Sequence, residues 1–131
     1  MLDKGSCLCG ACQFQIEAET GSVGKCHCSK CRKVSGTGSN AVFWLNPDQL
    51  RWIQGEKHIK TYTMPDGWGS VFCGNCGSPL PVVINESFCV APAGLMDDKV
   101  VVDFRGHIWF EDKPSWDVIG DDAPQFFQGA G

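Results

Sequence analysis

Seven of the nine cysteines in this chain lie in three short clusters whose spacing is typical of metal ligands. Two thiolates that are one or two residues apart readily bind the same zinc ion, at a Zn–S distance of about 2.3 Å, because a tight turn brings their sulfurs together. In sequence order the clusters are Cys7 and Cys9, then Cys26, Cys28 and Cys31, then Cys73 and Cys76.

This spacing predicts one closed metal site and one open metal site. Two pairs that lie far apart in the sequence can complete a single cage of four thiolates, which is a common ligand set of structural zinc. A separate trio leaves the fourth position of a zinc ion free, as a catalytic zinc requires. A division into four and three uses all the clustered thiols.

A disulfide framework is the alternative explanation, because small secreted domains often depend on disulfides. The number of cysteines is odd, however, and residues 1–5 show neither the basic start nor the apolar stretch of a signal peptide. No stretch approaches the roughly 20 apolar residues of a membrane span. We therefore expect metal-bound thiolates in a cytoplasmic protein.

Length and charge limit the other possibilities. With 131 residues, the chain is expected to form a single domain over residues 1–131. The formal net charge of −4 and the sequence pI near 5.2 argue against nucleic acid or an anionic membrane as the main partner, since both attract basic surfaces.

The elements that position the cysteines are predicted to be short strands, which makes the fold class all-β. In residues 11–18, Cys12, Phe14 and Ile16 alternate with other side chains, as in a half-buried strand. Residues 50–53 and 58–63 are predicted to form a hairpin, and a helical turn is expected to start at residues 114–117. Further strands are expected at 41–45, 80–84, 88–91 and 100–104.

Two cysteines have interpretations that do not involve metal. Cys12 repeats the C-x-C-x-x-C spacing with Cys7 and Cys9, so a duplicated trio is conceivable, but its place on the strand favours core packing. Cys89 has no partner nearby in the sequence and is expected to pack inside a strand.

Several polar residues near the trio are candidates for a role in catalysis. His27 is either a proton carrier or a packed imidazole that points away from the metal. His107 is a candidate to line a ligand groove together with Trp109 and Trp116. For the two tryptophans, the alternative that we favour is a place in the core. The region also contains three basic residues, Lys30, Arg32 and Lys33. They either bind a ligand carboxylate or form a solvated loop.

Three ordered motifs carry a family resemblance over nearly the whole chain. They are residues 5–10 (GSCLCG), 26–32 (CHCSKCR) and 72–78 (FCGNCGS), followed by 107–109 (HIW) and 113–116 (KPSW). In this order they resemble the glutathione-dependent formaldehyde-activating enzyme family, which includes the centromere protein V type.

The resemblance implies a zinc-stabilised tent of small, coiled antiparallel sheets, related in shape to Rab guanine-nucleotide-release proteins. The positions that match the family's structural zinc ligands are Cys7, Cys9, Cys73 and Cys76. The positions that match its second, catalytic-type zinc are Cys26, Cys28 and Cys31. Ser70 stands where members often carry an arginine.

The implied activity is carbon–sulfur lyase chemistry, in which glutathione and formaldehyde form S-hydroxymethylglutathione. A site of three thiolates favours a thiol as fourth ligand, and the metal would deprotonate that thiol. The expected partner is therefore a small thiol such as glutathione. The alternative is a non-catalytic zinc module that binds a small thiol or a protein partner.

Overall fold

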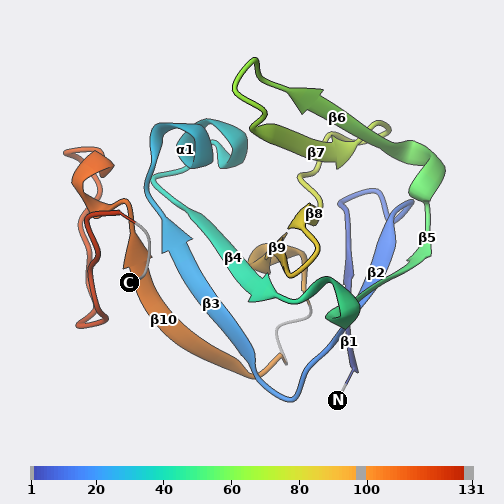
Figure 1. Cartoon of the computed structure of the whole chain (residues 1–131), viewed down its shortest axis with the longest axis horizontal. Coiled ribbons are helices and arrows are strands. Elements are labelled where there is room, and N and C mark those ends of the chain that lie inside the picture. Colours follow the sequence, from blue (N-terminus) through green and yellow to red (C-terminus); the bar gives the residue numbers. More distant parts are fainter. Residues whose placement is uncertain (1, 97–99, 129–131) are drawn as a thin grey trace.

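The computed structural model describes residues 2–96 and 100–128, and most of its regular structure is β-strand (Figure 1). One sheet has the order β1-β2-β5, with β1 (Leu2–Ser6), β2 (Gln13–Glu17) and β5 (Leu50–Gln54). A second sheet has the order β10-β3-β4-β9-β8, with β3 (Gly21–Cys26), β4 (Asn40–Leu45), β8 (Val82–Asn85), β9 (Phe88–Pro92) and β10 (Val102–Ile108). A third pairs β6 (Ile59–Thr63) with β7 (Gly69–Cys73).

The helical segments are short. The α-helix α1 spans Ser29–Ser35, and 3₁₀ turns occupy Pro47–Gln49, Glu56–His58, Ala93–Leu95 and Phe110–Asp112. Within the ranges that the structure describes, no helix has both the length and the apolar character needed to cross a membrane.

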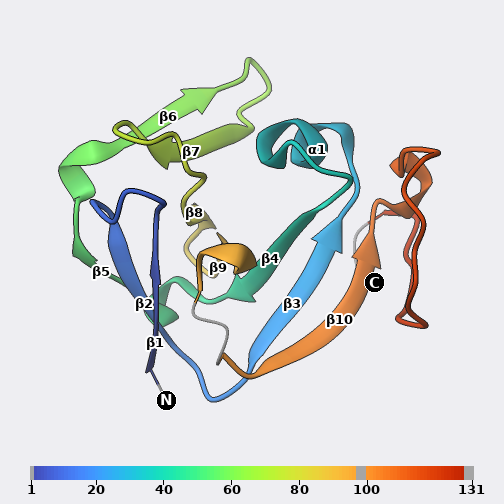
Figure 2. The same cartoon turned by 180° about the vertical axis from the view of Figure 1, so that it is seen from behind.

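The predicted all-β tent of small, coiled sheets is confirmed (Figures 1 and 2). Strands β10, β3 and β4 curve side by side, whereas the β6–β7 hairpin lies near α1 at the end of the molecule opposite the starts of β3 and β10. Every strand pair is antiparallel except β3 and β10, which run parallel. The first two sheets combine pairs of neighbouring strands, β1–β2 and β8–β9, with pairs that are distant in sequence, such as β2–β5, β4–β9 and β3–β10.

The predicted hairpin of residues 50–53 and 58–63 is wrong. Strand β5 pairs with β2, and β6 pairs with β7, so the two segments belong to different sheets. Gly55 separates them with a φ of 86°, and a Cβ placed there would lie 2.1 Å from the Ala11 carbonyl oxygen. Because the chain turns so closely against the 11–12 backbone, β6 leaves the first sheet instead of folding back on β5.

The structure contains one helix that the sequence did not predict and the turn that it did. Helix α1 was not predicted, because it has seven residues and no buried side chain to reveal a period. It is held at its ends instead: the Cys28 side chain accepts a hydrogen bond from the Cys31 N–H, and Gly36 ends the helix with a φ of 71°. Residues 114–117 form the expected single turn, closed by an Asp117 N–H to Pro114 carbonyl bond of 3.1 Å, and it does not continue into a helix.

The core lies between the first two sheets and continues beneath the amino-terminal loop. Its larger part is made of Phe14, Ile16, Val23, Phe43, Leu45, Cys89 and Ala91. Its smaller part is made of Cys7, Cys12, Cys73 and Leu80. Cys12 and Cys89 are both fully buried, which confirms that they pack in the core as expected from their strand positions.

Candidate metal centres and the adjoining cleft

The four-thiol cluster joins the loop after β1 to the end of β7. The sulfur atoms of Cys7, Cys9, Cys73 and Cys76 all lie within 4.8 Å of one another. Two of the separations are 3.6 Å, from Cys7 to Cys9, and 3.9 Å, from Cys9 to Cys73. A tetrahedral zinc with Zn–S bonds of about 2.3 Å requires sulfurs about 3.8 Å apart. This donor set therefore fits a closed zinc cage.

Hydrogen bonds from the surrounding chain orient these sulfurs. The Cys12 N–H donates to Cys7 Sγ over 3.3 Å, and the Asn75 side-chain amide donates to Cys9 Sγ over 3.2 Å. Hydrogen bonding to Ser78 lowers the pKa of Cys76 to about 5, which favours the thiolate that a metal requires.

The three-thiol cluster is formed by neighbouring residues at the junction of β3 and α1. Cys26 ends β3, Cys28 caps α1, and Cys31 lies in the first turn of the helix. Their sulfurs also lie within 4.8 Å of one another, and no fourth Cys, His, Asp or Glu among residues 2–96 and 100–128 joins them. The trio therefore fits a metal ion with one position left for another ligand.

The thiols of this trio differ in acidity. A hydrogen bond from the Cys31 thiol is the main cause that lowers the pKa of Cys26 to about 6. The same bond raises the pKa of Cys31, and burial raises that of Cys28. Cys26 is thus the thiol of the trio that deprotonates most readily, and metal binding has to displace the remaining thiol protons.

A cleft opens at the trio. Cys26 and Cys31 line a cavity of about 640 Å³ between the second sheet and the β6–β7 hairpin. A second hollow of about 530 Å³, between α1 and the β6–β7 hairpin, adjoins the first, and the two share Val34, Trp68, Ser70 and Pro79. Two of the three cysteines of the trio therefore face a cavity large enough for a small molecule.

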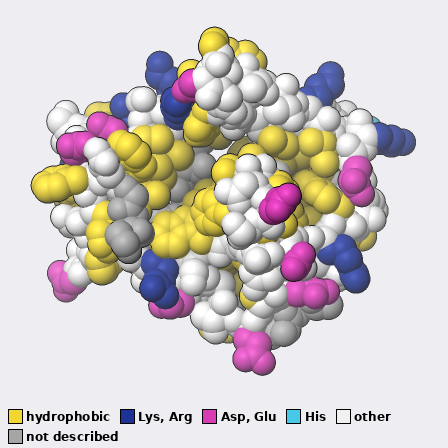
Figure 3. Space-filling view, in the orientation of Figure 1, with side chains coloured by type: hydrophobic (Ala, Val, Ile, Leu, Met, Phe, Trp, Pro, Cys, Tyr) yellow, Lys and Arg dark blue, Asp and Glu magenta, His cyan; other side chains and the backbone are white. Residues whose placement is uncertain are grey.

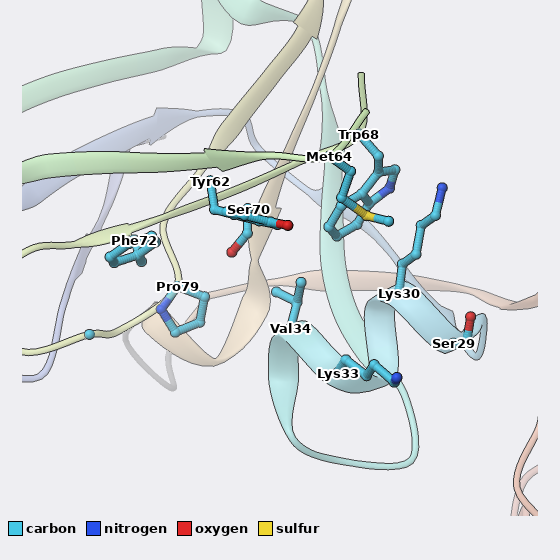
Figure 4. Close-up of a pocket in the computed structure, with 11 residues that line it drawn as sticks. Ser29, Lys30, Lys33, Val34, Tyr62, Met64, Trp68, Ser70, Phe72 and Pro79 are labelled. Carbon is cyan, nitrogen blue, oxygen red and sulfur yellow. The ribbon is translucent and has the colours of Figure 1, made fainter. Parts of the chain in front are cut away.

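The basic residues beside the trio divide between the second hollow and the protein interior. Lys30 and Lys33 of α1 both line this hollow; Lys30 extends toward Trp68, whereas the Lys33 side chain runs along the helix with its ammonium pointing away from Tyr62 and Phe72 (Figure 4). Lys30 Nζ lies 2.5 Å from Asp66 and 5.8 Å from the centre of the Trp68 ring. Arg32 does not face this hollow, and its Nε is buried.

His27 points away from the metal site, as the packed-imidazole alternative requires. It is fully buried, and its Nε2 lies 2.8 Å from Nδ1 of the equally buried His107. Nε2 of His107 in turn lies 3.0 Å from the carboxylate of Asp121. Burial is the main cause that lowers the pKa of His27, and the bond to His107 lowers the pKa of Asp121. Two buried histidines and the exposed carboxylate of Asp121 thus tie the β3–α1 junction to the carboxyl-terminal segment.

The suggestion that His107 lines a groove is wrong, because its side chain is inaccessible to solvent. The core role favoured for the tryptophans is wrong for Trp116, which is 68% exposed, whereas Trp109 is half-buried. Sequence reasoning missed Asp121, which lies in no motif. It reaches His107 because residues 124–126 run beside β10, with the Phe126 N–H donating to the His107 carbonyl over 2.8 Å.

The fold and the two clusters define a small β protein with two cysteine sites of metal-binding geometry. The profile of the family described as "Glutathione-dependent formaldehyde-activating enzyme" matches residues 2–112, and the chain belongs to this family. The resemblance of its cysteine motifs is thereby confirmed.

Two known proteins illustrate the likeness. A protein of Halomonas elongata named "Putative glutathione-dependent formaldehyde-activating enzyme" is 30% identical over 125 residues, which are 88% of this chain and 80% of that protein. A crystal structure of a Rhodobacter sphaeroides protein shares the fold, with a TM-score of 0.60 and 20% identity over 76% of this chain and 99% of that one.

Proposed function

We propose that this chain is a zinc-dependent enzyme that forms or cleaves adducts between a thiol and a carbonyl compound, with carbon–sulfur lyase chemistry. The observation that carries the proposal is the three-thiol cluster, which lacks a fourth ligand among the described residues and lies on a cleft. A purely structural zinc usually has four protein ligands. Family membership supports the same reaction class.

The proposal assigns a different role to each cluster. Cys7, Cys9, Cys73 and Cys76 hold a structural zinc. Cys26, Cys28 and Cys31 hold the second, more labile zinc. When bound, that second ion supplies positive charge that lowers the pKa of a thiol entering the cleft.

The residues around the cleft position the reactants. Lys30 and Lys33 form charge-assisted hydrogen bonds to a carboxylate of the thiol, and the cleft walls exclude water from the sulfur. The substrate sulfur then bonds to the carbonyl carbon, while the carbon–oxygen π electrons move to the oxygen. This oxygen takes a proton from solvent, which balances the proton lost by the thiol.

Glutathione fits this description, since it carries a thiol and two carboxylates, and the names of the family and of the Halomonas elongata relative include it. Formaldehyde is the carbonyl compound that the same names give. Cysteines that form no disulfides in either cluster suit a reducing compartment, and we propose the cytoplasm.

Zinc-edge X-ray absorption of the purified protein, with and without glutathione, tests the proposal. We expect the average number of sulfur ligands per zinc to rise when glutathione is added, and S-hydroxymethylglutathione to form faster in its presence than in buffer. An unchanged zinc spectrum together with no acceleration contradicts the proposal and favours the non-catalytic module.

A further inference from the structure

The second sheet is apolar on both faces, although only one face is covered by the core. On β4, Phe43 and Leu45 belong to the core, whereas Val42 and Trp44 line the 640 Å³ cavity. An antiparallel sheet that faces water normally carries polar side chains on that face. An apolar second face next to a reactive site therefore requires an explanation.

Strand β9 repeats this arrangement beside β4. Cys89 and Ala91 are fully buried in the core, and the alternate residues Phe88, Val90 and Pro92 line the cavity. Val82, Val83 and Ile84 of β8 extend the same wall, where Val83 and Ile84 are 57% and 55% exposed. Figure 3 shows hydrophobic side chains gathered around a hollow on this face.

The cavity is neutral as well as apolar. Apart from the thiols of the trio at one end, none of the described residues that line it is ionisable, and the polar side chains on its far wall are the hydroxyls of Thr61, Thr63 and Ser70. Gly24 leaves space for one wall residue, because a Cβ there would lie 2.2 Å from the Trp44 ring. The volume falls within the range of about 300–1,000 Å³ typical of small-molecule sites.

Formaldehyde does not use such a cavity, because it has one carbon and no apolar arm. The adjoining hollow, which Lys30 and Lys33 line, is the part of the site suited to the carboxylates of the thiol. The neutral cavity is then left for the carbonyl partner. Cys26 and Cys31 lie on its surface, so a carbonyl carbon at the trio can extend its substituent along β4 and β9.

We propose that the carbonyl substrate of this protein is an aldehyde with an apolar chain or ring, held in the cavity formed by β4, β8, β9 and the β6–β7 hairpin. The inference rests on the proposed function and names its substrate class. The thiolate sulfur bonds to the aldehyde carbon, the π electrons move to oxygen, and a solvent proton completes a hemithioacetal. The addition is redox-neutral and needs no external oxidant or reductant.

The test compares aldehydes of increasing length with glutathione held constant. Exchange between free aldehyde and hemithioacetal is followed by NMR for formaldehyde, butanal and hexanal, and each rate is divided by its uncatalysed value. Each buried methylene is worth about fourfold in affinity. We expect the acceleration to rise by a few-fold per methylene up to hexanal.

A binding measurement keeps the test independent of turnover. 1-Hexanol, which cannot form the adduct, is titrated into the zinc-loaded protein and followed by methyl NMR. Val90→Trp fills the cavity and should reduce both hexanol affinity and the preference for hexanal over formaldehyde by at least about tenfold. Val118→Trp is the matched control, because Val118 is 85% exposed and lines neither hollow.

Val83→Asp is a second cavity variant whose folding is secure, because Val83 is largely exposed. It should weaken hexanol binding, whereas Val118→Asp should not. Formaldehyde turnover with no chain-length dependence overturns the inference and leaves the proposed function standing. Chain-length dependence in a series of alkyl thiols, but not in the aldehydes, overturns the assignment of the cavity to the carbonyl. Hexanol binding without turnover of any aldehyde contradicts the proposed function itself.

Discussion

The two cysteine clusters differ in how much of the chain each one holds together. The four-thiol cluster joins residues 7–9 to residues 73–76, and Cys7 and Cys73 are buried beside Leu80 in the core. The three-thiol cluster takes its ligands from six consecutive positions, 26–31, and opens on a cleft.

This difference separates structural from chemical roles. A metal that closes a loop of more than sixty residues removes much conformational freedom from the unfolded chain, so its binding contributes to the free energy of folding. The second metal would be held by the end of one strand and one helical turn. The hydrogen bonds of α1 already order this segment, so the metal adds little to the free energy of folding. We therefore expect the first metal to maintain the fold and the second to take part in exchange.

The largest expected effect follows from breaking the first cage. Cys73→Ser removes a buried ligand, and structural zinc contributes on the order of 10 kcal/mol in small domains, about as much as the whole stability of a typical fold. We expect an insoluble or unfolded product, measured by circular dichroism and zinc content. A soluble variant with unchanged thermal stability would contradict the assignment of this cage.

The matching change in the second cluster should spare the fold. Cys28 caps α1 by accepting a hydrogen bond from the Cys31 N–H, and serine is a favourable residue at that position. Cys28→Ser should therefore keep near-native circular dichroism but lose the second zinc, glutathione entry and adduct formation. Loss of the fold in this variant contradicts the contrast between the two clusters.

Removal of metal from the unmodified protein tests the same contrast without a substitution. With three protein thiolates, the second site should bind zinc more weakly than the first. A mild chelator should remove one zinc per chain while circular dichroism stays constant, with metal counted by native mass spectrometry. If both metals leave together with cooperative unfolding, the second site is structural.

A smaller effect is expected from the histidine chain behind the trio. His107→Ala leaves the buried His27 ring without its partner, which should cost about 2–3 kcal/mol and loosen the 26–28 segment. We expect a lower melting temperature and easier loss of the second zinc, while the first zinc is retained until unfolding. Equal release of both metals contradicts this prediction.

Asp121→Asn provides the control for this chain. The asparagine side-chain oxygen still accepts the bonds that Asp121 accepts from the Ala123 N–H and from the His107 ring, so the geometry is preserved and only the charge is lost. Its effect on the melting temperature should be smaller than that of His107→Ala.

The parts of this molecule that sequence predicted are those with local signals. The cysteine clusters were evident because a metal requires ligands at short spacing, and β2 was evident because Phe14 and Ile16 alternate with polar residues. Strand pairing was not evident from the sequence. At Gly55, for example, the chain turns away from β5 because it packs against Ala11, a residue that is distant in the sequence.

Two other features had no sequence signal of their own. Helix α1 buries no side chain, so it has no apolar period and depends on its two caps. Asp121 meets His107 only because the carboxyl-terminal segment runs beside β10, which is a tertiary contact that no local pattern reports.

The smallest expected effect concerns the charged side of the cleft. Lys33 is exposed and makes no ion pair within the described ranges, whereas Lys30 is paired with Asp66, so Lys33 is the freer cation for a thiol carboxylate. Exposed charge pairs are worth about 0.2–1 kcal/mol each, and a reversed charge adds repulsion. Lys33→Glu should therefore raise the KM for glutathione by about threefold to tenfold, leave kcat nearly unchanged, and show less effect at high salt.

Lys57→Glu, which makes the same change away from both hollows, should leave the KM unaltered. An unchanged KM in Lys33→Glu at low salt would mean that the thiol carboxylates bind elsewhere. It would contradict the division of the site into a charged hollow for the thiol and an apolar cavity for the carbonyl compound.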